Sequence, residues 1–329
     1  MTTHAAPSFN ALIVLPRLKV INANCIGGDI TWGFPAITNF SGQMIAMERR
    51  LGVAYGLKLN GIGIVCHDFQ TKTYGEYVQR FYQQRAPLDK DGSTKGIVES
   101  GYIDIEVSLV YAVQADEALL KLSEEEHADV AAEVYQAVQE MRLAGGSVIH
   151  RRSHIKPQLV VLSDDSETRE SQFRRVKRQL LPGFALIGRD DLLQEHFIEL
   201  QASNPEATQL DALVDKVRVN HWSETDEAGE TTWRHSKPEG SGWIVPLAVG
   251  YGGLSKLYAP GEMAGVRRND VDVRIVECVY SLGEWLSPHR MTDMSELFWY
   301  PSYDPEKALY RCNNAYMSAA RPILPTSAR

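Results

Sequence analysis

The chain has 329 residues, of which 44% are hydrophobic and 23% are charged, close to the usage of ordinary globular proteins. This composition excludes a chain that is disordered throughout, because it supplies enough apolar surface for a large core. The 34 Lys and Arg residues against 42 Asp and Glu give a formal charge of −8, which argues against a generally basic nucleic-acid coat. A local basic surface is not excluded by this average.

The sequence shows no membrane or secretory pattern. It contains no run of about 18 apolar residues, and its N-terminal residues lack the basic-then-apolar order of a signal peptide. The four cysteines are far apart and form no Cys-x-x-Cys pair or His cluster that would complete a zinc site. We therefore expect a cytoplasmic protein with reduced thiols, no metal or other cofactor, and no membrane partner.

The first half of the chain predicts the order strand, helix, strand, strand, helix, strand. The predicted elements are a strand over 11–21, a helix from an N-cap at Ser41 to a stop at Gly52, strands over 57–69 and 102–113, a helix from the capping box Ser123–Glu126 to Gly145-Gly146, and an extended segment over 147–150. Pro16 cannot donate a ladder hydrogen bond, so the first strand is expected to be bulged or edge-like there.

This order is that of a ferredoxin-like (RRM-like) βαββαβ domain, whose two helices cover one face of a four-stranded sheet and whose open face is a common RNA platform. We therefore assign the chain to the α+β class, with a ferredoxin-like RNA-binding domain over residues 10–165. Residues 70–101 separate the two central strands with polar, basic and aromatic residues, and we interpret them as an extended arm. Arg85 and Lys95 are its candidate contact residues.

The second half, residues 166–329, predicts a mixed helical and β region packed on the first domain. Helices are expected over 166–181, around 192–200 and after a cap at Thr208–Asp211, and strands over 243–249 and 271–280. The strands could form a second sheet or a second copy of the first topology, and no sequence repeat decides between these. Residues 222–242 are polar, acidic and contain Gly, so we expect a mobile loop there.

Charge is distributed unevenly along the chain. Residues 116–140 carry eight acids and one lysine, whereas residues 142–178 carry nine basic residues and four acids. Such a basic stretch can neutralise phosphates, although a solvated helix face with acidic neighbours is the commoner origin of such a pattern.

Three segments carry residue types that suit RNA. Gly145-Gly146-Ser147 permits close backbone approach to a phosphate or sugar, although most Gly pairs there merely end a helix. The helix start at Ser41 offers backbone N–H groups to an anion. The loop before this helix supplies Asn and aromatic side chains, which can engage unpaired bases. Trp32 or Phe34 could instead fill the core. The candidate RNA-binding residues are Asn22, Asn24, Trp32, Phe34, Ser41, Gln43, Arg50, Arg142, Gly145, Gly146, Ser147, His150, Arg151 and Arg152.

Catalytic signals are weak, and we assign no catalytic residue. No dinucleotide or phosphate-loop fingerprint is present, and Gly240-Ser241-Gly242 does not form a nucleophile elbow. A histidine without partners, such as His67, is expected to be structural. His150 and His154 lie near arginines, so they could act as acid or base in RNA cleavage or simply contact phosphate.

Seven segments occur in a specific order along the chain: Leu15-Pro16-Arg17-Leu18, Asn22-Ala23-Asn24, Thr31-Trp32-Gly33-Phe34-Pro35, Gly61-Ile62-Gly63-Ile64-Val65-Cys66-His67, Met141-Arg142-Leu143-Ala144-Gly145-Gly146-Ser147, Leu181-Pro182-Gly183-Phe184-Ala185 and Gly283-Glu284-Trp285-Leu286-Ser287-Pro288-His289-Arg290. Together they resemble the crRNA 5′-handle-binding subunit of the type I-F CRISPR surveillance (Csy) complex, of the repeat-associated RNA-binding (RAMP) superfamily. The match runs from about residue 10 to about 312, and the ordered set makes it specific although no single motif is.

The resemblance implies a non-catalytic scaffold subunit that holds the 5′ handle of crRNA without cutting it, for antiviral DNA targeting. Its implied partners are the crRNA handle, the large subunit, the nearest backbone subunit and, through the assembled complex, target DNA. The glycine-rich loop and the first helix would cradle the RNA backbone, and Arg142, Arg151 and Arg152 would neutralise phosphates. Arg85 and Lys95 would touch the adjacent guide or a partner subunit.

Two alternatives remain open at the level of sequence. Some relatives in the superfamily are metal-independent endoribonucleases that process crRNA, and in that case His150 or His154 would be the general base. A third possibility is a protein-bridging subunit whose RNA contacts are incidental.

Overall fold

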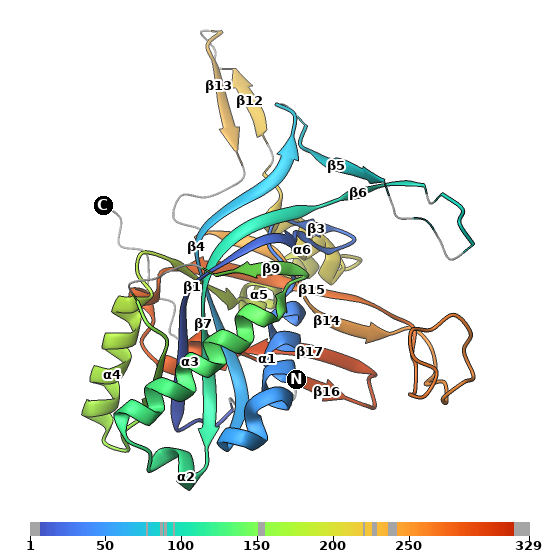
Figure 1. The fold of residues 1–329 in the computed structure, drawn as a ribbon. Helices are drawn as coiled ribbons and strands as arrows, with labels where there is room; N and C mark the ends of the chain where they lie inside the picture. The colour runs from blue at the N-terminus through green and yellow to red at the C-terminus, as the bar shows by residue number, and fades with distance from the viewer. Residues whose placement is uncertain are drawn as a thin grey trace.

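The computed structural model describes residues 7–76, 78–85, 88, 91–94, 96–150, 155–219, 221–225, 229–235 and 242–318. These residues form a mixed α/β fold around one large antiparallel sheet with helices on both faces (Figure 1). The α+β class predicted from the sequence is compatible with this architecture. Four of the candidate residues lie outside the described residues: Lys95, Arg151, Arg152 and His154.

Four strands from the first half lie side by side in the sheet, in the spatial order β4, β7, β1, β9. The elements that build this part are β1 (Ala11–Asn24), α1 (Ile37–Tyr55), β4 (Leu57–Tyr74), β7 (Tyr102–Ala115), α2 (Glu117–Leu120), α3 (Glu124–Glu140), β8 (Arg142–Leu143), β9 (Gly146–Ile149) and β10 (Gln158–Val161). The register of β1 against β7 shifts between Leu15 and Leu18, which confirms the bulge expected at Pro16. β1 is not an edge strand, because it lies between β7 and β9.

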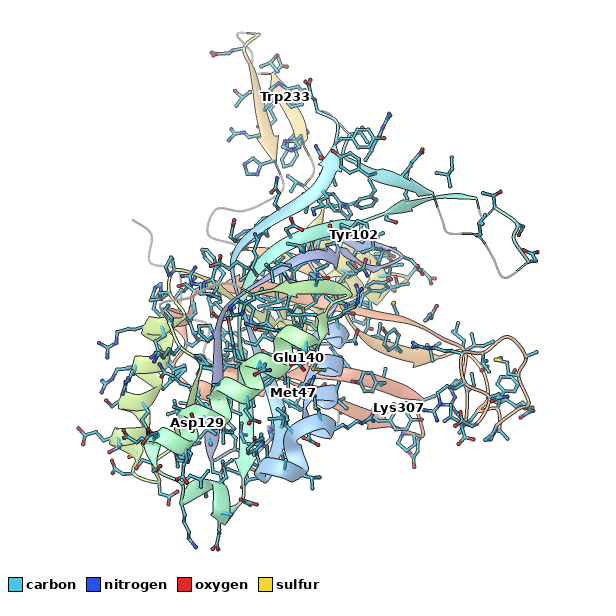
Figure 2. The ribbon with its side chains drawn as sticks, viewed as in Figure 1. Met47, Tyr102, Asp129, Glu140, Trp233 and Lys307 are labelled. Carbon is cyan, nitrogen blue, oxygen red and sulfur yellow. The ribbon has the colours of Figure 1, made fainter. Side chains whose placement is uncertain are left out.

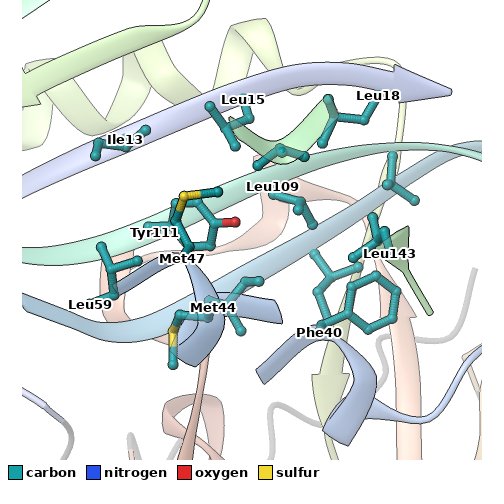
Figure 3. Packing of buried hydrophobic residues seen from close by; sticks show 14 of the residues in the cluster. Ile13, Leu15, Leu18, Phe40, Met44, Met47, Leu59, Leu109, Tyr111 and Leu143 are labelled. Atoms are coloured by element: carbon teal, nitrogen blue, oxygen red, sulfur yellow. The ribbon is translucent and has the colours of Figure 1, made fainter. Parts of the chain in front are cut away.

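One face of these strands packs against α1 and α3. The alternation along β7 points Ile105, Leu109 and Tyr111 into a large apolar cluster. Phe40 and Met44 of α1 lie in the same cluster as Leu109 and Tyr111 (Figure 3). Alternating burial on a strand places every second side chain on the same face, so this run of residues dictates which face the helices cover.

The opposite face, which a ferredoxin-like topology leaves open, is covered at one end of the strands. Leu12, Val14 and Val110 are buried there beneath Phe173 and Val176 of α4 (Ser166–Gln179). The open face expected from the sequence is therefore closed at this end, because the amphipathic α4 covers it. At the other end of the strands, the same face carries side chains that are not buried, among them Tyr102, Asp104 and Lys19.

The second half extends the same sheet. Its elements are β11 (Phe184–Gly188), α5 (Asp190–Ser203), α6 (Gln209–Val217), β14 (Ile244–Gly253), β15 (Val276–Leu286), the short helices η1 (Pro288–Arg290) and η2 (Met294–Leu297), β16 (Phe298–Asp304), β17 (Leu309–Asn314) and η3 (Ala315–Ser318). Both β11 and β16 pair with β4, which continues the sheet from that edge. The strands therefore continue the first sheet and do not form a separate one, whereas the three helices predicted here are confirmed.

The arm and one further hairpin project from the body (Figure 1). The arm consists of the far end of β4 with β5 (Arg80–Arg85) and β6 (Ile97–Ser100), within residues 70–101. The other is a hairpin of β12 (His221–Thr225) and β13 (Thr231–His235), whose ten residues are all exposed. The prediction of a loop over 222–242 was therefore wrong for the residues of β12 and β13 in that range, because these strands pair with each other although neither has a buried face.

Helix ends also differ from the sequence expectation. α1 begins after Ala36 and ends before Gly56, whose φ of 61° suits glycine, so neither Ser41 nor Gly52 marks an end. α3 does begin at the Ser123 capping box, but it ends at Glu140. Gly145 then lies in the turn between β8 and β9 instead of at a helix end.

Candidate functional site

Two adjoining cavities, lined mainly by polar residues, lie where β1, β4, β7 and the β8–β9 hairpin come together. They have volumes of about 370 and 380 Å³ and share Asn22 and Tyr102. We call them together the polar groove, which is lined by Asn22, Gln70, Thr71, Lys72, Thr73, Tyr82, Tyr102, Arg142, Gly145, Gly146 and Ser147. Figure 2 shows Tyr102 at the base of the arm. The groove thus joins four residues of the glycine-rich segment to the base of the arm.

Asn22 is fixed in the groove by its backbone and by Lys72. Its φ of 55° lies in the left-handed region that asparagine tolerates, at a second register shift in β1. Its N–H donates to Asp104 Oδ1 at 2.8 Å, and Lys72 Nζ donates to Asn22 Oδ1 at 2.6 Å. The side-chain amide N–H groups of Asn22 therefore remain available to a ligand, because the carbonyl end is the end that Lys72 holds.

Asp104 is the counter-ion within the groove. Partial burial opposes its ionisation, but the Asn22 N–H and the Lys72 ammonium together hold the pKa of this carboxyl below its ordinary value. Lys72 Nζ lies 2.9 Å from Asp104 Oδ1. The charge of Lys72 is thus partly neutralised, which leaves Arg142 as the groove cation with the greater capacity for an anion.

Arg142 and the glycine turn form the other wall. Arg142 Nη1 donates to the Gly145 carbonyl at 2.9 Å, and this is the one hydrogen bond of the Arg142 side chain to the described residues. Since a guanidinium has five N–H donors, four remain for a ligand. A Cβ on Gly146 would lie 2.7 Å from the Ala23 nitrogen, so only glycine lets this hairpin approach β1 so closely.

Several other sequence candidates are engaged inside the protein. Ser41 is fully buried, and Gln43 accepts a hydrogen bond of 2.5 Å from the buried Tyr111 hydroxyl. Their expected place at an exposed helix start was wrong, because α1 begins a turn earlier. Phe34 packs against Phe40 and Trp285, with ring centroids 5.7 and 4.8 Å apart. We therefore leave Ser41 and Gln43 out of any RNA surface.

The remaining described candidates do not line the groove. Asn24 closes a local turn on Ile26, Arg50 forms an ion pair with Glu140, and the ring of His150 contacts the Gln139 amide at 3.0 Å. Trp32 is half exposed and packs edge-to-face on Phe81 of the arm, with ring centroids 5.4 Å apart. Arg85 lies on β5 of the arm.

Sequence reasoning missed Lys72, Tyr82 and Tyr102 as groove residues. Tyr102 opens the strand with the strictest alternation, and its polar series of Tyr102, Asp104 and Glu106 was a readable sign of an uncovered face. The position of Lys72 opposite Tyr102 depends on strand register, which the sequence alone does not fix.

His67 is structural, as the sequence indicates. Its Nδ1 lies 2.6 Å from the Pro182 carbonyl oxygen and its Nε2 lies 2.7 Å from Ser108 Oγ. Burial lowers the pKa of the imidazole, so the ring is neutral at pH 7. These bonds attach the loop before β11 to the central strands.

Two negative findings apply to the described part of the chain. No group of three or more His, Cys, Asp or Glu side chains there has an arrangement that could hold a metal ion. Among the same residues, no helix combines the length and apolar character needed to cross a membrane.

Comparison with known proteins identifies the family. Residues 13–312 match the family described as CRISPR-associated protein (Cas_Csy2). The chain is also 42% identical over 315 residues to CRISPR-associated protein Csy2 of Pseudomonas aeruginosa (strain UCBPP-PA14), which covers 92% of this chain and 94% of that protein. These matches place the chain among the CRISPR-associated proteins. Within it, the chain belongs to the Csy2 family, which confirms the resemblance to a subunit of the type I-F Csy complex.

Proposed function

We propose that this chain is a non-catalytic scaffold subunit that holds the 5′ handle of crRNA in a cytoplasmic Csy complex. The large subunit and the nearest backbone subunit would be its protein partners, and target DNA would be met through the assembled complex. The observation that carries the proposal is the polar groove, where Asn22, Arg142 and Gly145–Ser147 meet in one cavity although their segments are far apart in the sequence.

The arrangement of strands supports a ferredoxin-like unit over residues 10–165, with residues 166–329 packed on it. The order β4, β7, β1, β9, all antiparallel, and the helices α1 and α3 on one face are the features of that topology. RNA-binding domains of this kind bind their ligand on the face without helices. The polar groove lies on that face, beyond the part that α4 covers.

The groove contains the chemistry for a single strand of RNA. The unused donors of Arg142 suit a phosphate, and the Asn22 amide suits an acceptor on a base edge. Tyr82 and Tyr102 present rings from neighbouring elements, and stacking on an aromatic ring contributes about 1–3 kcal/mol per base. The handle backbone would run across β1 and β7 toward the arm.

A charge reversal of Arg142 tests the proposal. Arg142→Glu should weaken binding of handle RNA by at least about tenfold, since charge-assisted hydrogen bonds contribute about 1.5–3 kcal/mol and reversal adds repulsion. Arg142→Gln should lower the slope of log affinity against log salt by about 0.7, as expected for the loss of one phosphate contact to a single strand. Fluorescence anisotropy with labelled handle RNA measures both.

The matched control is Arg174→Glu, a charge reversal on the exposed side of α4, away from the groove. It should leave the affinity within about twofold of the wild type. Equal effects of the Arg142 and Arg174 reversals would contradict binding in the groove. The processing-nuclease alternative would be supported by specific cleavage of repeat RNA by the purified protein in EDTA, because its general base would need no metal.

A further inference from the structure

A third hollow, apolar and about 350 Å³ in volume, lies beside the polar groove. We call it the aromatic pocket and define it by Trp32, Phe34, Phe69, Phe184, Trp243 and Trp285. These rings come from five separate segments of the chain. Trp32, Phe69, Phe184 and Trp243 are 50%, 52%, 45% and 45% exposed. Single exposed apolar residues are ordinary, but a cluster that lines a hollow indicates a binding site.

Contacts between the rings hold the pocket in shape. Phe184 packs edge-to-face on Trp243 at 5.8 Å between centroids, and Trp243 lies 6.3 Å from Trp285. Trp285 in turn packs edge-to-face on Phe34 at 4.8 Å, which stacks on the core residue Phe40. Because the series runs into the core, the walls are fixed before any ligand enters.

Two polar side chains in the lining have hydrogen-bonding groups that no described residue uses. Asp68 is exposed and makes no hydrogen bond or ion pair through its carboxylate with any described residue. A bulge in β4 between Cys66 and Asp68 turns this part of the strand, as bulges beside binding sites do. Thr31 is 6% exposed, and its buried hydroxyl has no partner in the described part of the chain.

The aromatic pocket adjoins the polar groove along a free strand edge. Phe69 lines the pocket and Gln70, the next residue of β4, lines the groove. On the side of β4 away from β7, described pairing with β11 ends at Cys66 and pairing with β5 starts at Thr73. A strand of RNA in the groove could therefore turn one nucleotide over this edge.

We propose that the aromatic pocket receives one unstacked nucleobase of the bound RNA, with N–H groups on its edge directed at the Asp68 carboxylate. The inference rests on the proposed function and names its base-recognition site. Guanine fits best, because its adjacent N1–H and N2–H groups match two carboxylate oxygens, whereas uracil offers one N–H between two carbonyls. The negative charge of Asp68 keeps phosphates out, which separates this pocket from the groove.

The test is a double-mutant cycle on the full-length chain. Handle RNAs carrying one abasic site at each position in turn are titrated against the wild type and Trp243→Ala. One position should lose about tenfold in affinity in the wild type, and Trp243→Ala should cost about tenfold with intact RNA. Combining the two changes should cost no more than either alone, because both remove the same contact.

Asp68→Asn supplies a second variant that leaves the apolar walls intact, because the side chain is exposed. It should reduce the preference for the native base over uracil at that same position by about tenfold. Trp233→Ala is the matched control, since Trp233 is 69% exposed on the β12–β13 hairpin (Figure 2) and does not line the pocket. It should leave every affinity unchanged.

The outcomes separate the two proposals. Additive losses at every position would overturn the nucleobase pocket, and so would unchanged RNA affinity of Trp243→Ala with weaker assembly into the complex, which would mean a protein side chain fills it. In either case Arg142→Glu would still weaken handle binding if the groove holds RNA. Loss of that Arg142 effect as well would contradict the proposed function itself.

Discussion

His67 lies in a hydrogen-bond chain that fixes its protonation state. A carbonyl oxygen only accepts, so His67 Nδ1 must carry the proton that it donates to Pro182. His67 Nε2 then accepts from the Ser108 hydroxyl, whose oxygen accepts the Arg17 N–H at 3.1 Å. Every member of this chain is satisfied with a neutral ring, and a second proton on Nε2 would face the Ser108 hydroxyl.

A lowered imidazole pKa makes the stability of the protein depend on pH in a defined direction. Between about pH 6.5, the ordinary value, and the lower pKa of folded His67, the unfolded chain binds a proton that the folded chain does not. The free energy of unfolding should therefore decrease as the pH falls below about 6.5, and His67 should contribute no pH dependence above it. His67→Asn should reduce this decrease in urea titrations at pH 7.5 and 5.5. Identical pH profiles for His67→Asn and wild type would contradict the assignment, and His150→Asn, at an exposed site, serves as control.

At Gly183 the neighbouring residues leave no room for a Cβ atom. A Cβ there would lie 2.6 Å from His67 Nδ1 and 2.8 Å from the Leu180 carbonyl oxygen. Gly183→Ala should therefore lower the free energy of unfolding by about 1–3 kcal/mol, the usual cost of overpacking. Gly42→Ala, in the middle of α1 with nothing near its Cβ, should instead raise it by about 0.5–1 kcal/mol. Chemical denaturation of both variants measures the pair, and an equal sign of change would contradict this explanation.

Elements with local signals could be predicted from the sequence. The capping boxes at Ser123–Glu126 and Thr208–Asp211 start helices as expected, because each involves only four consecutive residues. The prediction of Ser41 as the N-cap was wrong, because α1 starts after Ala36 without any side-chain cap. The sequence therefore carries no capping signal at the true start of this helix. The β12–β13 hairpin was missed because all its residues are exposed, and an unburied pair of strands has no apolar alternation.

The capping box of α3 provides a prediction for a whole element. Ser123 Oγ accepts the Glu126 N–H at 3.3 Å, and Glu126 accepts the Ser123 N–H at 2.8 Å. Ser123→Ala should lower the free energy of unfolding by about 1 kcal/mol, the typical cost of removing an N-cap. Ser123→Asp should restore most of that loss, since aspartate is an equally good cap beside a helix N-terminus. Urea denaturation distinguishes the two variants. Equal destabilisation by Ser123→Ala and Ser123→Asp would contradict the attribution of this stability to the N-cap, because aspartate can replace serine as a cap.

The candidate site depends on the assembly of the whole sheet. Asn22, Arg142 and the glycine turn were predicted one by one from composition, but nothing in the sequence placed them in one cavity. Their meeting depends on β9 pairing with β1, where Ser147 lies opposite Ile21, and on β7 bringing Tyr102 beside them. Register between distant segments is set by tertiary packing, so the sequence could nominate residues without defining the groove.

Residues 10–165 and 166–329 share both a sheet and a core, which predicts how the molecule unfolds. Phe298 and Leu297 from the second half are buried with Leu12 and Val110 from the first, and β4 pairs with β11 and β16. Calorimetry of the full chain should therefore show one transition. Residues 10–165 alone would expose the β4 edge and this cluster, so they should aggregate or lack a cooperative transition.

Trp299→Phe tests the same coupling inside the intact chain. Trp299 is buried on β16, and its Nε1 donates to the Leu186 carbonyl of β11 at 2.7 Å. Losing the indole leaves that buried carbonyl without its partner, at a cost of about 1–3 kcal/mol. If the halves unfold together, the variant should shift the single transition as a whole to lower temperature. A second transition that moves while the first stays fixed would show instead that the two halves are independent domains, because only separate cooperative units can respond separately.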